Sequence, residues 1–284
     1  MTVWFITGAS RGFGLEITKE ALSRGDSVIA TARNPQAITD ALPDAGEHLL
    51  AVSLDVHEPA QITAAVDAGI DRFGRIDVLV NNAGRGLVGA IEETSDEEAR
   101  AVFDVNVFGL LAVTRAVLPH LREQRSGKVL NLSSVGGFVA WPGWGLYSAT
   151  KFAVEGLSEA LRGELAPFGI VVTAIEPGPF RTNFLDGSSL SVAQLSIDDY
   201  AETGGAARGW ATDNNYGQDG DPEKAGRIIV DLADRAELPE RIQLGRSSFQ
   251  DVADKLTRTA ADQQEWREIA LSADFAPTSN SKSG

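Results

Sequence analysis

Short apolar runs recur along the first half of the chain and alternate with longer stretches of mixed apolar and polar residues. Runs of this length are too short for helices and suit strands buried on both faces of a parallel sheet. The longer stretches, such as residues 15–24 and 59–73, have helical periodicity. The predicted strands are residues 3–6, 28–31, 48–54, 76–80 and 128–132. This alternation predicts an α/β fold, a single domain with a doubly wound parallel sheet and helices on both faces.

The C-terminal third has a different pattern. Between residues 177 and 220 the periodicity is lost, and Gly, Asp, Asn and Ser become frequent. Long irregular segments within compact domains commonly form lids or binding loops, so a substrate lid is predicted at about residues 179–220. The remaining predicted elements are a helix over 221–235, a strand over 242–244 and a helix over 248–271, which complete a domain of residues 1–275, and a flexible tail over 276–284.

One predicted helix is apolar enough to raise the question of a membrane span. Residues 99–121 are mostly apolar, but they include Arg100, Asp104, Asn106 and Arg115. Polar and charged residues at intervals along such a segment favour a buried or interface helix over a membrane-spanning one.

Composition restricts the partners of the chain. With 40 acidic against 25 basic residues, its net charge is −15 and its pI about 4.6, which disfavours nucleic acid and anionic membranes. The absence of cysteine excludes disulfides, thiolate catalysis and cysteine-ligated metals. His48, His57 and His120 lack metal-ligand spacing, so no metal site is predicted. The N-terminus lacks a basic and apolar leader, and we expect a cytoplasmic protein.

A glycine-rich turn follows the first predicted strand and leads into the first predicted helix. Its sequence, Thr-Gly-Ala-Ser-Arg-Gly-Phe-Gly, occupies residues 7–14. Gly8 allows a sharp turn, Gly12 lets the backbone approach a pyrophosphate, and Gly14 permits close packing of helix on strand. Three glycines also occur in ordinary loops, and the spacing differs from G-x-G-x-x-G, so the flanking strand and helix carry the prediction of a dinucleotide site.

The end of the second predicted strand bears on the choice between NAD and NADP. An NAD site usually places an acidic residue there to hold the ribose 2′-hydroxyl. This chain has Thr31-Ala32-Arg33 instead, and Asp26 lies before the strand, at the wrong end. Arg33, together with Arg11 in the glycine turn, is suited to bind a 2′-phosphate, which predicts NADP(H). The alternative is a pair of solvated surface arginines.

Tyr147 and Lys151 are spaced to lie one turn apart on the same face of a helix. A free tyrosine, with a pKa near ~10, is a poor proton carrier at neutral pH, whereas a neighbouring cation favours its phenolate. Lys151, alone or with an oxidised nicotinamide, is therefore expected to lower the pKa of Tyr147 into a working range. The pair also arises by chance on solvated helices, so its assignment depends on the rest of the chain.

Polar clusters follow several predicted strands, and parallel sheets bind ligands at the carboxyl ends of their strands. These clusters are Asp55-Val56, Asn81-Asn82-Ala83-Gly84 and Ser133-Ser134. Together with the glycine turn, Asn106, Tyr147-x-x-x-Lys151 and Pro177-Gly178-x-x-x-Thr182, they stand in an order that resembles the short-chain dehydrogenase/reductase family. The resemblance covers residues 7–182, and the ordered set is far more specific than any single motif.

This resemblance implies a Rossmann-like fold, a nicotinamide cofactor and a tetrad of Asn106, Ser134, Tyr147 and Lys151. Tyr147 would move the proton at the carbonyl oxygen, Ser134 would orient that oxygen, and Lys151 would hold the nicotinamide ribose. Asn106 would anchor a water that relays protons to Lys151; the alternative is a buried helix asparagine bonded to backbone. The residues expected to bind NADP(H) are Gly8, Ser10, Arg11, Gly12, Phe13, Gly14, Arg33, Asp55, Val56, Asn82, Ala83, Gly84, Tyr147, Lys151, Pro177, Gly178 and Thr182.

The helix that carries Tyr147 also has a stripe of small residues opposite its catalytic face, namely Ala149, Ala153, Gly156, Ala160 and Gly163. Small side chains let another helix approach closely, although helix propensity alone would also favour alanine. Because glycine inside a helix is unfavourable, an interface is the preferred interpretation. The resemblance agrees, and it predicts a homodimer or homotetramer formed through residues 99–121 and 147–165.

Aromatic and apolar residues near Tyr147 and in the predicted lid suggest an apolar substrate pocket, although each of them can equally be a packing anchor. They are Phe138, Trp141, Trp144, Leu146, Phe180, Phe184, Leu185, Tyr200, Trp210 and Tyr216. The predicted function is hydride transfer between NADP(H) and a hydrophobic ketone, aldehyde or secondary alcohol of steroid-like, retinoid-like or fatty character. The alternatives are an NADP-responsive binding protein without turnover and an epimerase that retains its cofactor.

Overall fold

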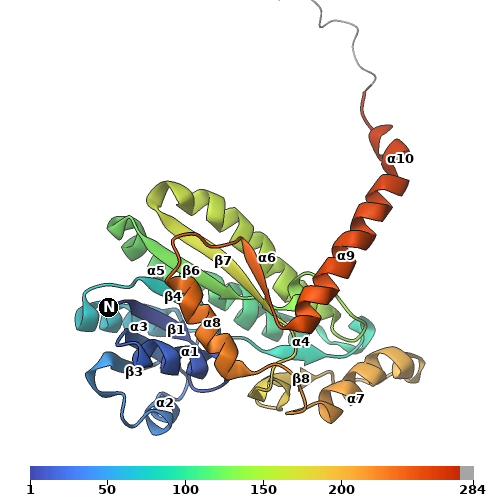
Figure 1. Ribbon diagram of the computed structural model, residues 1–284. Helices are drawn as coiled ribbons and strands as arrows, with labels where there is room; N and C mark the ends of the chain where they lie inside the picture. Colours follow the sequence, from blue (N-terminus) through green and yellow to red (C-terminus); the bar gives the residue numbers. More distant parts are fainter. Residues whose placement is uncertain (276–284) are drawn as a thin grey trace, which may run out of the picture.

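The structure, a computed structural model, describes residues 1–275 (Figure 1). Its centre is a sheet of seven strands, and every neighbouring pair is parallel. In spatial order the strands are β3 (Leu49–Ser53), β2 (Ser27–Ala32), β1 (Val3–Thr7), β4 (Val78–Asn81), β6 (Gly127–Leu132), β7 (Ile170–Pro177) and β9 (Arg241–Leu244). The predicted doubly wound parallel sheet is confirmed.

Helices cover both faces of this sheet because alternate strand residues point to opposite sides. Trp4 and Ile6 of β1 belong to one core, and Val3 and Phe5 belong to the other. The first core also contains residues of α1 (Gly12–Ser23), α2 (Gln36–Ala41) and α8 (Pro222–Ala233). The second contains residues of α3 (Pro59–Phe73), α5 (Leu110–Gln124) and α6 (Gly145–Leu165).

The predicted helix over residues 99–121 is a continuous helical segment, formed by α4 (Asp96–Phe103), a π-helical turn (Asp104–Gly109) and α5. By length and composition the segment Asp96–Gln124 could span a membrane. In this fold, however, Val113, Val117 and Leu121 pack into the core on one face of the sheet. The segment is thus a core helix of the domain.

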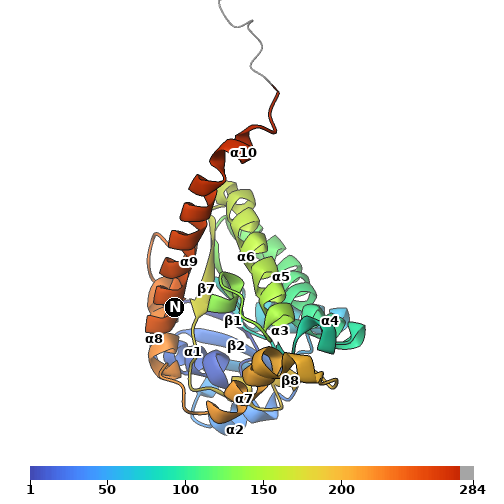
Figure 2. The same cartoon turned by 90° about the vertical axis from the view of Figure 1, so that its right-hand side faces the viewer.

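The predicted lid region is more regular than its sequence suggested. It contains α7 (Ala206–Asp213) and β8 (Leu190–Val192), and β8 pairs in parallel with β5 (Gly86–Val88) outside the main sheet. The views in Figures 1 and 2 both place α7 and β8 at the same end of the molecule. These elements, with α2 and β7, were not among the predicted ones.

The last two helices, α9 (Arg246–Glu265) and α10 (Arg267–Leu271), project away from the rest of the molecule, as Figures 1 and 2 show from two directions. Ser248 and Val252 anchor the base of α9 in the fold, whereas residues 256–275 are exposed. The tail predicted over 276–284 lies outside the described residues.

Candidate active site

A cavity of about 960 Å³ lies where the carboxyl ends of the strands meet the lid. Segments that follow β1, β2, β3, β4, β6 and β7 contribute to its walls, together with the predicted lid segment and with Ser247 and Asp251 of α9. Of the residues predicted to bind cofactor or to catalyse, all line this cavity except Gly14 and Asn106. The edge of the sheet therefore brings together residues that are up to about 170 positions apart in the chain, as parallel topology predicts.

The glycine turn adopts a conformation that only glycine readily provides. Gly8 and Gly12 have φ angles of +65° and +53°, in the left-handed region. A Cβ on Gly14 would lie 2.4 Å from the carbonyl oxygen of Gly8, so Gly14 supports the turn from behind rather than lining the cavity. The first helix begins at Gly12, and the Arg11 side chain does not cap it. Its first N–H groups are therefore oriented to receive an anion such as a pyrophosphate.

The loop after β4 is tied to this turn by hydrogen bonds. The Asn82 side chain donates to the carbonyl oxygens of Thr7 (2.8 Å) and Gly8 (3.0 Å). In return, the Thr7 hydroxyl accepts from the backbone N–H groups of Asn82 and Ala83, each at 2.9 Å. The two loops thus form one rigid wall of the cavity, which places Gly84 beside Lys151.

The two arginines predicted to bind a 2′-phosphate have different surroundings. Arg33 is exposed and lines the cavity beside Asn34. Arg11 also lines the cavity, but its guanidinium donates to the hydroxyl oxygens of Ser188 (2.7 Å) and Ser189 (2.9 Å) in the lid. Within residues 1–275, therefore, Arg33 is an exposed arginine at the cavity, whereas Arg11 joins the glycine turn to the predicted lid segment.

Tyr147 lies at the floor of the cavity, in α6, with 8% of its surface exposed. Burial raises the pKa of Tyr147 to about 12, and a hydrogen bond with Ser134 acts in the opposite direction. Ser134 accepts the backbone N–H of Gly136 at 3.0 Å, which fixes its hydroxyl at the cavity wall. The phenol is thus neutral at physiological pH in the unliganded chain.

Lys151 is buried one turn away. Its ammonium donates to the carbonyl oxygen of Leu132 at 2.7 Å and lies 5.8 Å from the centre of the Tyr147 ring. Burial lowers the pKa of Lys151 to about 8, and the charge of Glu155 opposes that shift. The expectation that Lys151 alone lowers the pKa of Tyr147 is wrong for the unliganded chain, because burial disfavours the phenolate and raises that pKa.

Asn106 lies in the π-helical turn and is almost fully buried. Its side-chain oxygen accepts the backbone N–H of Arg85 at 2.8 Å, and its amide donates to the Arg85 carbonyl (2.8 Å) and the Thr150 hydroxyl (3.0 Å). Asn106 therefore holds the loop after β4 against α6. Its bonds to the Arg85 backbone resemble the alternative interpretation, a buried asparagine bonded to backbone. Its predicted role in a water relay remains a prediction.

The apolar end of the cavity is formed by aromatic side chains in contact with Tyr147. Trp144 packs edge-on against Tyr147 with 6.0 Å between ring centres and against Trp210 with 6.2 Å, and Phe184 lies 5.4 Å from Tyr147. Trp141, Phe180 and Leu185 also line the cavity, as predicted.

Four of the residues predicted for this pocket do not line the cavity, namely Phe138, Leu146, Tyr200 and Tyr216. Phe138 packs under the guanidinium of Arg241 at 5.7 Å. The hydroxyls of Tyr200 and Tyr216 hydrogen-bond to Glu92 (2.6 Å) and Asp186 (2.9 Å). The prediction that these four residues form part of the pocket is therefore wrong.

A buried ion pair that the sequence analysis did not identify anchors the lid. Glu93, which is almost fully buried, accepts from the Arg208 guanidinium at 2.6 Å and from the backbone N–H of Ile197 at 2.9 Å. The backbone N–H of Ile197 is the largest contribution that keeps the pKa of Glu93 low, with Ala90 and Arg208 adding to it. Because its two residues are 115 positions apart, no local pattern indicates this pair.

The family model for short chain dehydrogenases matches residues 2–191 of the chain. The chain belongs to the short-chain dehydrogenase family. It is 38% identical over 272 residues to oxidoreductase BOA17 of Botryotinia fuckeliana, a match that covers 95% of this chain and 98% of the relative. It is 39% identical over 242 residues to a 3-ketodihydrosphingosine reductase of Bacteroides thetaiotaomicron, covering 84% and 86%.

Solved structures of this family agree with the fold. A short-chain dehydrogenase of Streptomyces avermitilis superposes with a TM-score of 0.90 at 42% identity, covering 96% of this chain and 99% of that one. A 3-ketoacyl-(acyl-carrier-protein) reductase of Brucella melitensis complexed with NADH has a TM-score of 0.72 at 28% identity, covering 87% and 98%. A serine dehydrogenase complexed with NADP+ has a TM-score of 0.72 at 28% identity, covering 86% and 94%. Structural neighbours of this short-chain dehydrogenase thus bind either nicotinamide dinucleotide.

Proposed function

We propose that this short-chain dehydrogenase transfers a hydride between NADP(H) and a hydrophobic ketone, aldehyde or secondary alcohol in the cytoplasm. The observation that carries the proposal is the position of Tyr147, a buried neutral phenol between a dinucleotide-sized cradle and an aromatic pocket. A binding protein without turnover would need the cofactor-binding part of the cavity. It would not need a proton donor placed between that part and the aromatic pocket.

The residues present fit a dinucleotide. The glycine turn and the free N-terminus of α1 would hold the pyrophosphate, while Asp55 and Val56 would hold the adenine. The part of the cavity assigned to the nicotinamide ribose and ring is lined by Asn82, Ala83, Gly84, Lys151, Pro177, Gly178 and Thr182. When bound, the nicotinamide supplies or accepts the hydride.

In the reducing direction, Tyr147 donates its proton to the oxygen of the carbonyl as that oxygen becomes an alcohol. The Ser134 hydroxyl donates a hydrogen bond to the same oxygen and fixes its position. Lys151, as an ammonium, would hold the nicotinamide ribose and stabilise the phenolate that remains on Tyr147, and solvent returns the proton to Tyr147. In the oxidising direction each residue carries out the reverse step.

The aromatic walls support an apolar substrate. Trp144, Phe184 and Trp210 offer flat surfaces, and the segment about 179–220 would act as the lid over them. Steroid-like, retinoid-like and fatty carbonyl compounds all suit such walls. The relative named as a 3-ketodihydrosphingosine reductase supports the long-chain class.

The test of this function is the oxidation of NADPH in the presence of a panel of apolar and polar carbonyl compounds, with NADH run in parallel. We expect turnover of at least one apolar ketone or aldehyde and little turnover of small charged ones. Tight NADPH binding without turnover of any carbonyl or, in reverse, any alcohol would instead support a regulatory binding protein. Inversion of an alcohol centre without net cofactor consumption would support an epimerase.

We further propose a homodimer or homotetramer formed through residues 99–121 and α6. The small-residue stripe of α6 is open to solvent in the single chain, and a Cβ on Gly156 or Gly163 would meet no atom within 4 Å. Exposed small residues on a long helix leave room for a second helix to approach closely. Phe108 and Phe152, exposed on the same pair of helices, add apolar surface.

We expect Ala160→Phe to weaken this oligomer, because a bulky ring on the stripe would overpack a close helix contact. Ala64→Phe, at an exposed alanine of α3 outside the proposed interface, is the matched control. Light scattering coupled to gel filtration should show a lower mass for Ala160→Phe only. The interface is excluded if both variants keep the wild-type mass.

A further inference from the structure

Two glutamates lie buried behind the catalytic helix. Glu155, on α6, has 6% of its surface exposed, and Glu176, on β7, has none. Both side-chain oxygens of Glu155 and one of Glu176 lack a hydrogen-bond partner among the described residues. Buried carboxylates without such partners are unfavourable unless they hold a proton or face a cation. Neither residue takes part in the proposed reaction.

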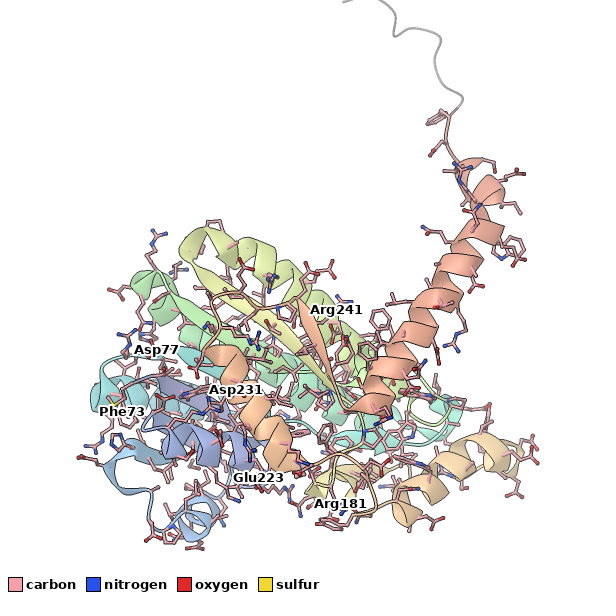
Figure 3. All side chains as sticks on the ribbon, viewed as in Figure 1. Phe73, Asp77, Arg181, Glu223, Asp231 and Arg241 are labelled. Carbon is pink, nitrogen blue, oxygen red and sulfur yellow. The ribbon has the colours of Figure 1, made fainter. Side chains whose placement is uncertain are left out.

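The one cation beside both carboxylates in the described part of the chain is Arg241, the first residue of β9, which is labelled in Figure 3. Its Nε lies 3.7 Å from Glu155 and 3.9 Å from Glu176, and its Nη2 lies 3.1 Å from the exposed Glu159. Gln243 donates a hydrogen bond to Glu176. Because one guanidinium is shared among three carboxylates, the buried pair retains a proton more readily than free glutamates would.

The pKa shifts of the two glutamates follow from this geometry. Burial, reinforced by the charge of Glu176, raises the pKa of Glu155 to about 7, while the neighbouring Ser133 hydroxyl and Arg241 oppose the shift. Burial likewise raises the pKa of Glu176. Glu155 thus changes its charge near neutrality, where a surface glutamate is fully ionised.

Glu155 is also one helical turn from Lys151, on the same buried face of α6. The space between α6 and the loop after β6 is closely packed, since a Cβ on Gly137 would lie 2.5 Å from Ser133 Oγ, 3.0 Å from Glu155 Cγ and 3.0 Å from the Lys151 carbonyl oxygen. The titratable and charged groups that face this region are Lys151, Tyr147, Glu155 and Glu159 from α6, Glu176 from β7 and Arg241 from β9. Among these anions Glu155 lies one helical turn from Lys151, and its charge raises the pKa of Lys151 against the lowering by burial.

We propose that Glu155 is a positioning residue of the active site, whose carboxylate, balanced from behind by Glu176 and Arg241, keeps the buried Lys151 in its ammonium form. The ammonium is the form that the proposed reaction requires, so this role rests on the proposed function. The effect on Lys151, however, is a property of the unliganded chain. It can therefore be tested whether or not a substrate is found.

A purely structural role is the competing account, in which the cluster only ties α6, β7 and β9 together. Both accounts predict a pH effect on stability. Because the pKa of Glu155 is raised in the fold, its stabilising contribution is fully present below about pH 4.5 and is lost as the pH rises through about 7. A melting curve therefore cannot distinguish the two accounts, whereas the protonation state of Lys151 can.

The experiment is a pH titration of the intact chain labelled with [15Nζ]lysine, followed by NMR. The chain has only six lysines, and Lys151→Arg identifies the signal of Lys151. Glu155→Gln should lower the titration midpoint of Lys151 by about one pH unit or more. Glu159→Gln, on the next turn and bonded to the same arginine, should leave it unchanged, and Glu176→Gln should leave it unchanged or raise it.

An unchanged midpoint in Glu155→Gln would overturn the proposal and leave the structural role. If Glu155→Gln does not fold, the wild-type signal of Lys151 decides the question. It should show a second inflection near pH 7 as Glu155 titrates, and the absence of that inflection would overturn the proposal. Where turnover is found, the alkaline limb of the rate profile should move to lower pH in Glu155→Gln in parallel with the NMR midpoint. If Glu155→Gln lowers the Lys151 midpoint but no turnover is found with any substrate, the proposed function is refuted and the role of Glu155 stands.

Discussion

Tyr147→Phe is expected to abolish hydride transfer to a carbonyl while leaving the affinity for NADPH nearly unchanged. The substitution removes only the hydroxyl, and the ring keeps its contacts with Trp144 and Phe184. Loss of a positioned general acid reduces the rate by about 10²–10⁴-fold. The rate of NADPH oxidation under saturating substrate, together with NADPH binding by calorimetry, measures both parts of the prediction.

Tyr200→Phe is a suitable control, because the Tyr200 hydroxyl bonds Glu92 outside the cavity. It should retain wild-type turnover. If Tyr147→Phe retains activity within about tenfold of wild type, Tyr147 is not the proton donor. If the variant instead loses NADPH affinity, the phenol contributes to the cofactor site more than to the chemistry.

The pH dependence of this reaction follows from the two buried groups. Burial raises the pKa of Tyr147 to about 12 and lowers that of Lys151 to about 8 in the unliganded chain. The neutral phenol and the ammonium coexist below about pH 8, so carbonyl reduction should be fastest on the acidic side of that value. Alcohol oxidation requires the phenolate, which the cation of an oxidised nicotinamide would favour.

Arg33→Asp is expected to reverse the choice between NADPH and NADH. Arg33 lines the cavity with an exposed guanidinium, and a charge-assisted bond to a 2′-phosphate contributes roughly 1.5–3 kcal/mol. This corresponds to a preference for NADPH of about tenfold or more in the wild type. A carboxylate in its place would repel the phosphate and accept hydrogen bonds from the free ribose hydroxyls.

Competitive binding of the two cofactors to wild type and variant measures this preference. Arg72→Asp, which makes the same charge change on α3 and whose arginine does not line the cavity, should leave the preference as it is in the wild type. Equal affinities of the wild type for NADPH and NADH would contradict the NADP assignment whatever the variant does. A separate variant, Arg11→Ala, is expected to have a smaller effect, because Arg11 bonds Ser188 and Ser189.

Much of the fold was predictable because the strands of a doubly wound sheet are buried on both faces and appear as short apolar runs. The helix predicted over 59–73 matches α3, and the strand over 128–132 matches β6 within one residue. The strand β7 was missed, although its run of apolar residues carries the same signal. The strand β8 in the predicted lid was missed for a different reason. It is short and depends on pairing with β5, about 100 positions away in the chain.

The sequence by itself determined which residues meet in the cavity, because the motifs stand in one order and parallel topology brings the ends of all strands to one edge. Only the tertiary structure decided how those residues behave. Burial, which depends on the whole fold, makes Tyr147 a neutral acid instead of a phenolate. Long-range packing likewise places Glu176 and Arg241 beside Glu155. It also brings Ser188 within hydrogen-bonding distance of Arg11. Such contacts join residues far apart in the chain, and no local pattern records them.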